Sequence, residues 1–214
     1  MDIEQRLQLA IMAHGFRADL RAADQTFRNH KELWEWAATF KLAAVTLGNV
    51  VDLEPLTRQL YIDNQELSAT FKQFEKEAQF ARYLRNTFAA HKNEELVRQA
   101  IAWRPEIRMF VSDIDETKST LIDLFVLETA INTYIAEDGS HKIFDGETDL
   151  VYPPDVQRFN AYLEKTVTGA LSYLDMLIRT LLAGYTPPNW EEEGLQLAAK
   201  AGKMDFGFVT KGKR

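Results

Sequence analysis

Arg85, Asn86 and His91 lie within seven residues of one another, and their side chains can bind a phosphate and move a proton. Histidine changes its protonation state near neutral pH, so His91 could act as a general base or acid. The planar guanidinium of Arg85 could hold a phosphate oxygen. Asn86 could orient the phosphate or the imidazole. These three are the candidate catalytic residues, and this chemistry calls for no cofactor.

Helical geometry constrains how these residues could work together. In a regular α-helix, His91 would lie about 120° around the axis from Arg85 and about 9 Å further along it. One straight helix therefore does not easily bring both side chains to one atom. A distortion near Ala89-Ala90 would help. A two-fold dimer would help more, because it could bring His91 of one chain near Arg85 of the other. The motif thus predicts a homodimer.

The motif ends the clearest helical pattern of the chain, which runs over 65–91. Apolar residues recur there at spacings of three and four, as on one face of an amphipathic helix. This face comprises Leu67, Phe71, Phe74, Ala78, Ala81, Leu84 and Phe88. Such a stripe is nearly always core packing, so we expect it to hold the motif against a bundle.

Weaker patterns of the same kind predict the remaining helices. Their expected ranges are 3–27, 30–47, 55–62, 94–102, 115–135, 155–184 and 191–200. Gly48-Asn49 is a credible stop for the second of them. Asp145-Gly146 has apolar flanks and indicates a small β-hairpin near 141–152, with an irregular loop as the alternative.

The predicted fold is therefore all-α, an up-and-down bundle of five to six helices. We expect the bundle to occupy residues 1–185. Residues 186–214 would form a C-terminal extension with a basic, mobile end. This end could contact a phosphate backbone, although such tails are more often only solvated.

Composition excludes several classes of protein. The chain has 214 residues, no cysteine, 46% hydrophobic and 27% charged residues, which is typical of a globular protein. No apolar run is long enough to cross a bilayer, and Met1-Asp2-Ile3-Glu4 does not begin a secretory signal, so a cytoplasmic location is expected. The net charge of −7 disfavours a broad nucleic-acid surface. Residues 200–214 carry +4, which leaves −11 on the remainder.

Other familiar sites are missing or weak. The sequence has neither a phosphate-binding glycine loop nor a His-Glu-x-x-His metal motif. Its four histidines, His14, His30, His91 and His141, are scattered, so no metal is expected. Glu128 interrupts an apolar helix face. It could be a buried acid, or it could lie at the edge of the face or pair with an arginine or lysine.

The segment Arg85-Asn86-Thr87-Phe88-Ala89-Ala90-His91-Lys92 resembles the motif of the HEPN superfamily, in the form found in abortive-infection and toxin proteins. In that motif an arginine, often followed by a polar residue, precedes a histidine by a few positions near the end of a long helix. The resemblance implies a helical bundle that dimerises and cuts RNA without a metal. It also implies that Arg85, Asn86 and His91 are catalytic, and that a nucleotidyltransferase-type antitoxin is a partner.

Three interpretations follow from these observations. The first is a metal-independent endoribonuclease of the toxin or phage-defence kind. The second is a non-catalytic HEPN-like module that binds RNA, a nucleotide or a protein. The third is a helical bundle unrelated to that family, in which His91 favours a helix end and Arg85 and Asn86 pair with Glu94 or Glu95.

Overall fold

The computed structural model describes residues 1–90 and 93–203. The chain divides into two compact units, Met1–Leu182 and Ala183–Arg214. In the described residues all regular elements are helical, which confirms the predicted all-α class. No helix in this part of the chain is both long and apolar enough to span a membrane.

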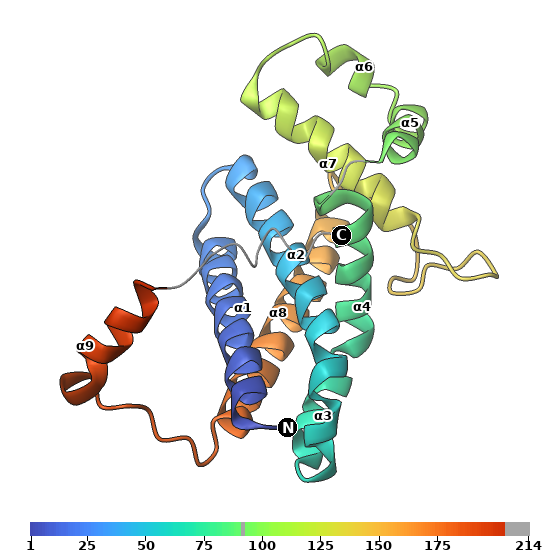
Figure 1. The fold of residues 1–214 in the computed structure, drawn as a ribbon. Coiled ribbons are helices and arrows are strands. Elements are labelled where there is room, and N and C mark those ends of the chain that lie inside the picture. Colours follow the sequence, from blue (N-terminus) through green and yellow to red (C-terminus); the bar gives the residue numbers. More distant parts are fainter. Residues whose placement is uncertain (91–92, 204–214) are drawn as a thin grey trace. The chain divides into compact units, whose positions relative to one another are not determined.

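The described residues of the first unit form eight α-helices and two short turns of other helix types (Figure 1). The elements are α1 (Ile3–Asn29), α2 (Leu33–Thr57), the 3-10 turn η1 (Arg58–Ile62), α3 (Gln65–Lys72), α4 (Glu75–Leu84), the π turn η2 (Arg85–Ala89), α5 (Glu94–Trp103), α6 (Ile107–Phe110), α7 (Glu116–Asn132) and α8 (Pro153–Leu181). The described part of the second unit contains α9 (Trp190–Ala201).

Two apolar clusters hold the first unit together. One lies between α1, α2, α3, α4 and α8, and its fully buried members include Leu20, Leu47, Leu67, Phe74 and Tyr173. The other joins the first half of α2 to α4, α5, α7 and the first half of α8, with Phe40, Phe80, Leu84, Leu127 and Phe159 at its centre. The second cluster also buries Phe88 of η2. The end of α4 is therefore anchored where Arg85 and Asn86 begin η2.

The predicted stop of the second helix at Gly48-Asn49 is wrong, because α2 continues to Thr57. Leu47, Val50 and Leu53 are buried on either side of the glycine, so the helix gains core packing by continuing. A glycine inside a helix costs only about 1 kcal/mol relative to alanine, and this burial offsets that cost. Gly48, Asn49 and Asp52 consequently lie on one continuous helix.

The apolar face predicted over 65–91 is confirmed as core, since all seven of its side chains are buried. The single long helix is wrong in detail. A turn at Gln73-Phe74 separates α3 from α4, and the backbone of Phe74 leaves helical geometry there. Phe71 and Phe74 both pack against Tyr173, with ring centroids 5.2 and 6.3 Å away. The break therefore lies where two consecutive aromatic positions of the stripe meet the same ring.

The hairpin proposed near 141–152 does not form, and the segment is the irregular loop given as its alternative. The β-type pairing here is one isolated bridge between Ile135 and His141. Side chains bind the loop backbone instead of a second strand. Asn132 exchanges two hydrogen bonds with the backbone of Thr148, each of 2.8 Å. The loop is thus attached to α7 by side-chain contacts. An alternation of apolar and polar residues, which is the sequence pattern of a strand, does not reveal such contacts.

His141 is a structural part of this loop. Its Nδ1 accepts hydrogen bonds from the backbone N–H groups of Ile143 and Phe144, at 3.0 and 2.9 Å. Its Nε2 lies 2.8 Å from the carbonyl oxygen of Ile131. Since Nδ1 accepts, Nε2 must carry the proton of a neutral ring. Burial lowers the pKa of His141 below its usual value.

This arrangement predicts a pH-dependent contribution of His141 to stability. The contribution is complete above the histidine pKa of the unfolded chain, about 6.5. It declines as the pH falls toward the lower folded pKa, because the unfolded chain then binds a proton that the folded ring refuses. We expect the urea midpoint of the wild type to fall more between pH 7.5 and 5.5 than that of His141→Gln. His14→Gln, at an exposed position, should behave like the wild type. Equal pH dependence in wild type and His141→Gln would contradict this role.

Candidate functional site

Arg85 and Asn86 open the π turn η2 at the end of α4. The backbone N–H of Ala90 donates to the carbonyl of Arg85 at 2.9 Å, a bond that spans five residues instead of four. Single π turns are rare in proteins, and many of those that do occur lie at functional sites. Local distortion near this point was one of the two solutions that the sequence offered for bringing the motif together. It occurs over Arg85–Ala89, slightly earlier than expected.

The Arg85 guanidinium is held by three oxygen acceptors. Its Nε donates to Oδ1 of the neighbouring Asn86 at 2.9 Å. Its Nη1 donates to Oδ1 of Asn49 at 3.0 Å and to Oδ2 of Asp52 at 2.7 Å. The Arg85 side chain is only 15% exposed. Within residues 1–90 and 93–203, Nη2 has no hydrogen-bond partner. Arg85 is therefore a fixed cation with one nitrogen still able to bind a ligand.

Asp52 also binds a second arginine. Its Oδ1 accepts from Nη2 of Arg82 at 2.9 Å, while its Oδ2 binds Arg85. We call Asn49, Asp52, Arg82, Arg85 and Asn86 the Asp52 cluster. It contains two cations and one carboxylate, so it retains one net positive charge on an otherwise acidic chain. A local positive charge beside a guanidinium nitrogen that has no partner among the described residues can bind an anion such as a phosphate.

The pairing of Arg85 with Glu94 or Glu95, which belongs to the third interpretation, is not what the structure shows. Glu95 binds Arg98 and Gln99 of its own helix, whereas Arg85 binds Asp52 across the bundle. Asp52 lies four residues after Gly48, which is one helical turn. The sequence predicts that Gly48 and Asp52 share a helix only if the second helix extends past Gly48.

His91 and Lys92 lie outside the described residues, so the geometry of the complete motif stays a prediction. The offset of about 120° between Arg85 and His91 assumed a regular α-helix. Because Arg85–Ala89 form a π turn, that assumption does not hold. The angular argument for a homodimer is correspondingly weakened, and the dimer stands as a prediction of the family resemblance.

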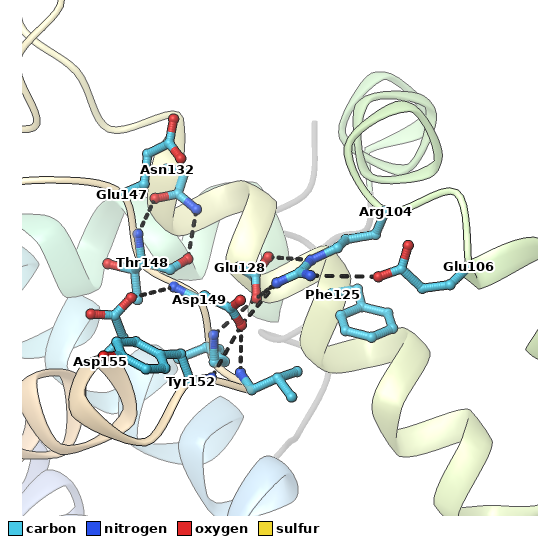
Figure 2. Close-up of polar contacts among 12 residues, drawn as sticks. Arg104, Glu106, Phe125, Glu128, Asn132, Glu147, Thr148, Asp149, Tyr152 and Asp155 are labelled. Atoms are coloured by element: carbon cyan, nitrogen blue, oxygen red, sulfur yellow. Dashed lines mark hydrogen bonds and ion pairs between the residues drawn. The ribbon is translucent and has the colours of Figure 1, made fainter.

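Glu128 lies in a second polar cluster. It is a buried acid and is also paired with an arginine, so each of the two alternatives given for it is partly right. It is completely buried on α7, and it pairs with Arg104 at the end of α5. Arg104 donates from Nε to Oε1 at 2.7 Å and from Nη2 to Oε2 at 3.0 Å. Figure 2 shows the Arg104 guanidinium with dashed lines to Glu128 and Asp149 on one side and to Glu106 on the other, and with the Phe125 ring nearby.

We call Glu128, Arg104 and Asp149 the Glu128 cluster. It fastens the loop over residues 133–152 to α5 and α7. The backbone N–H of Leu150 donates to Oε2 of Glu128 at 2.9 Å, and Asp149 binds Nη2 of Arg104 at 2.8 Å. The hydrogen bonding of Arg104 to the Glu128 carboxylate is the main cause of a raised Arg104 pKa. Every charged group in the cluster is paired, so we assign it to structure. The signal missed in the sequence was Arg104, which lies in a segment without a periodic pattern.

Metal-ligating side chains do not gather in the described residues. No three histidine, aspartate or glutamate side chains converge there in a way that could hold a metal ion. His30 lies at the end of α1, with Nδ1 2.9 Å from the carbonyl of Phe27, and His141 is engaged by its own loop. Comparison with protein-family models, curated proteins and solved structures finds no match to this chain. The Asp52 cluster, with its rare π turn, is therefore the candidate site on physical grounds.

Proposed function

We propose that this chain is a metal-independent endoribonuclease of the HEPN toxin or phage-defence type, acting through Arg85, Asn86 and His91. The observation that carries the proposal is the held guanidinium of Arg85, fixed by Asn49 and Asp52 at the start of a π turn. Because a fixed cation is already ordered, it stabilises the charge that develops on a phosphate without a cost for reorganisation during the reaction.

The proposed reaction is an internal transesterification of RNA. A ribose 2′-oxygen attacks the adjacent phosphorus and gives its proton to a base, while the bond from phosphorus to the 5′-oxygen breaks. The departing 5′-oxygen takes a proton from an acid. The products are one fragment with a 2′,3′-cyclic phosphate and one with a 5′-hydroxyl. His91 would serve as the base or the acid.

Arg85 and Asn86 would bind the phosphate in this reaction. Nη2 of Arg85 can donate to a non-bridging oxygen while Nε and Nη1 keep the guanidinium in place. Oδ1 of Asn86 already accepts from Arg85, which leaves the amide nitrogen of this exposed residue to donate to the same phosphate. RNA is the proposed substrate, a second copy of the chain the proposed dimer partner, and a nucleotidyltransferase-type protein the proposed antitoxin.

A non-catalytic HEPN-like module that binds RNA or a protein is the second candidate function. Asp52 favours it, because this carboxylate partly neutralises both Arg82 and Arg85 and so weakens their attraction for a phosphate. This alternative predicts binding without strand cleavage. It also predicts that His91→Ala leaves binding unchanged.

RNA cleavage in the presence of EDTA tests the proposed function. We expect purified protein to cut unstructured or structured RNA in EDTA and to leave 2′,3′-cyclic phosphate ends. A matched oligonucleotide with 2′-deoxyribose throughout should remain intact, because it lacks the nucleophile. Binding without cleavage on varied RNAs would favour the second candidate. Cutting of the 2′-deoxy strand would contradict the proposed reaction.

A further inference from the structure

Gly48 gives the Arg85 side chain the space that it occupies. A Cβ atom built on Gly48 would lie 2.7 Å from Cδ, 2.9 Å from Nε and 3.0 Å from Nη1 of Arg85. All three distances are shorter than ordinary contacts between a methyl group and neighbouring atoms. The guanidinium stem therefore crosses α2 directly over the glycine, where every other residue type would obstruct it.

The next turn of the same helix supplies the acceptors. Asn49 and Asp52 follow Gly48 by one and four positions, and both bind Nη1 of Arg85. Asp52 lies one turn beyond Gly48, so it meets the guanidinium after the stem has crossed the helix. Gly48 thus sets the path of Arg85, and Asn49 and Asp52 set where that path ends.

We infer that Gly48, Asn49 and Asp52 are positioning residues for Arg85, and that the motif on η2 works only with this segment of α2. The inference rests on the proposed function, and it adds a second part of the chain to the site. None of the three is proposed to touch RNA with its own reactive group. Asp52 has a second consequence, because its negative charge lies beside the phosphate position and opposes RNA binding while it holds Arg85 in place.

Gly48→Ala is a sharp probe because the clash falls on a flexible side chain. The atoms that would be displaced belong to the outer half of Arg85, not to the backbone of a neighbouring helix. The fold can therefore accept the new methyl group, and alanine also favours the helix. We expect the thermal midpoint of Gly48→Ala to stay at or above that of the wild type while Arg85 moves.

Gly15→Ala is the matched control. Gly15 also lies inside a long helix, α1, but a Cβ built there meets no heavy atom within 4 Å. We expect Gly48→Ala to lower kcat for RNA cleavage about 10- to 100-fold, as a displacement of a catalytic group by about 1 Å can do. Gly15→Ala should leave kcat within about twofold of the wild type. Equal rates for the two variants would overturn the positioning role of Gly48.

Asp52→Asn tests the other half of the inference without adding an atom. The amide removes the charge that opposes RNA, so KM should fall. It also weakens the hold on Arg85, so kcat should fall too. A merely structural role would not lower KM and kcat together. An unchanged kcat, or a raised KM, would overturn the role of Asp52.

The position of Arg85 is measurable without any cleavage. The Nε–H of Arg85 donates to Asn86, so its NMR signal should exchange slowly with water in the wild type. The signal is assigned by its loss in Arg85→Lys. We expect faster exchange in Gly48→Ala and Asp52→Asn but not in Gly15→Ala. If the wild type does not cut RNA yet this pattern appears, the proposed function fails and the positioning stands. Slow exchange in all variants would overturn the positioning itself.

Discussion

Replacing Arg104 by alanine is expected to lower the free energy of unfolding by about 3–5 kcal/mol, the usual cost of leaving a buried charge without its partner. Glu128 is completely buried, and Arg104 binds both of its carboxylate oxygens. In the variant, the backbone N–H of Leu150 would be the remaining donor to this carboxylate among the described residues. One neutral donor does not replace a bidentate guanidinium. Urea unfolding followed by circular dichroism measures the loss.

Arg98→Ala is the matched control for this prediction. Arg98 lies on the same helix and binds Glu95 through a short ion pair, but 76% of its side chain is exposed. Solvent screens exposed ion pairs, so this variant should lose little stability. A double variant, Arg104→Met with Glu128→Leu, should recover part of the stability lost in Arg104→Ala, because it removes the uncompensated charge. A loss in Arg104→Ala no greater than in Arg98→Ala would contradict the assigned role.

The contrast between these two arginines shows what the sequence could not reveal. The Arg98–Glu95 pair follows from a spacing of three on one helix, which any reader of the sequence can find. Arg104 and Glu128 are separated by 24 residues and meet only because α5 packs against α7. Arg104 also precedes Pro105 in a segment without helical periodicity, so no local pattern indicated its orientation.

The apolar helical face over 65–91 was predictable because its pattern is local and repeated. Each apolar residue in it contributes to the same face, so a single error in one position does not change the prediction. The break at Gln73-Phe74 lies instead where Phe71 and Phe74 meet Tyr173 of α8, and the π turn at Arg85–Ala89 packs Phe88 near Phe40 of α2. Such tertiary contacts leave little signal in local spacing.

The positions of the candidate site divide in the same way. Arg85 and Asn86 were predicted from residue type and spacing, because the segment resembles a motif that has both residues on one helix. The sequence does not predict the roles of Asp52 and Gly48, because a glycine favours the end of a helix, whereas core packing continues this helix to Thr57. The rule that glycine ends a helix depends on a difference in helix propensity of about 1 kcal/mol. The burial of apolar side chains on both sides of Gly48 contributes more than that.

His91→Ala is expected to lower the rate of RNA cleavage by about 10²- to 10⁴-fold, the usual contribution of a general acid or base. RNA binding should change little, because Arg85 and Asn86 would still hold the phosphate. The measurement is single-turnover cleavage in EDTA, with RNA affinity determined separately on a 2′-deoxy analogue. His14→Ala serves as the control, since His14 is exposed on α1. Equal loss of rate in both variants would contradict a specific role for His91.

Co-expression of Arg85→Ala and His91→Ala chains then decides whether one subunit or two form the site. If Arg85 of one chain works with His91 of the other, a mixed dimer keeps one intact pair, and a statistical mixture should regain about a quarter of wild-type activity. If each chain uses its own pair, every site in the mixture carries one substitution and no activity returns. The π turn makes this experiment necessary, because it weakens the angular argument that favoured two subunits. Recovery would show that the homodimer is part of the catalytic unit, and its absence would assign the whole motif to one chain.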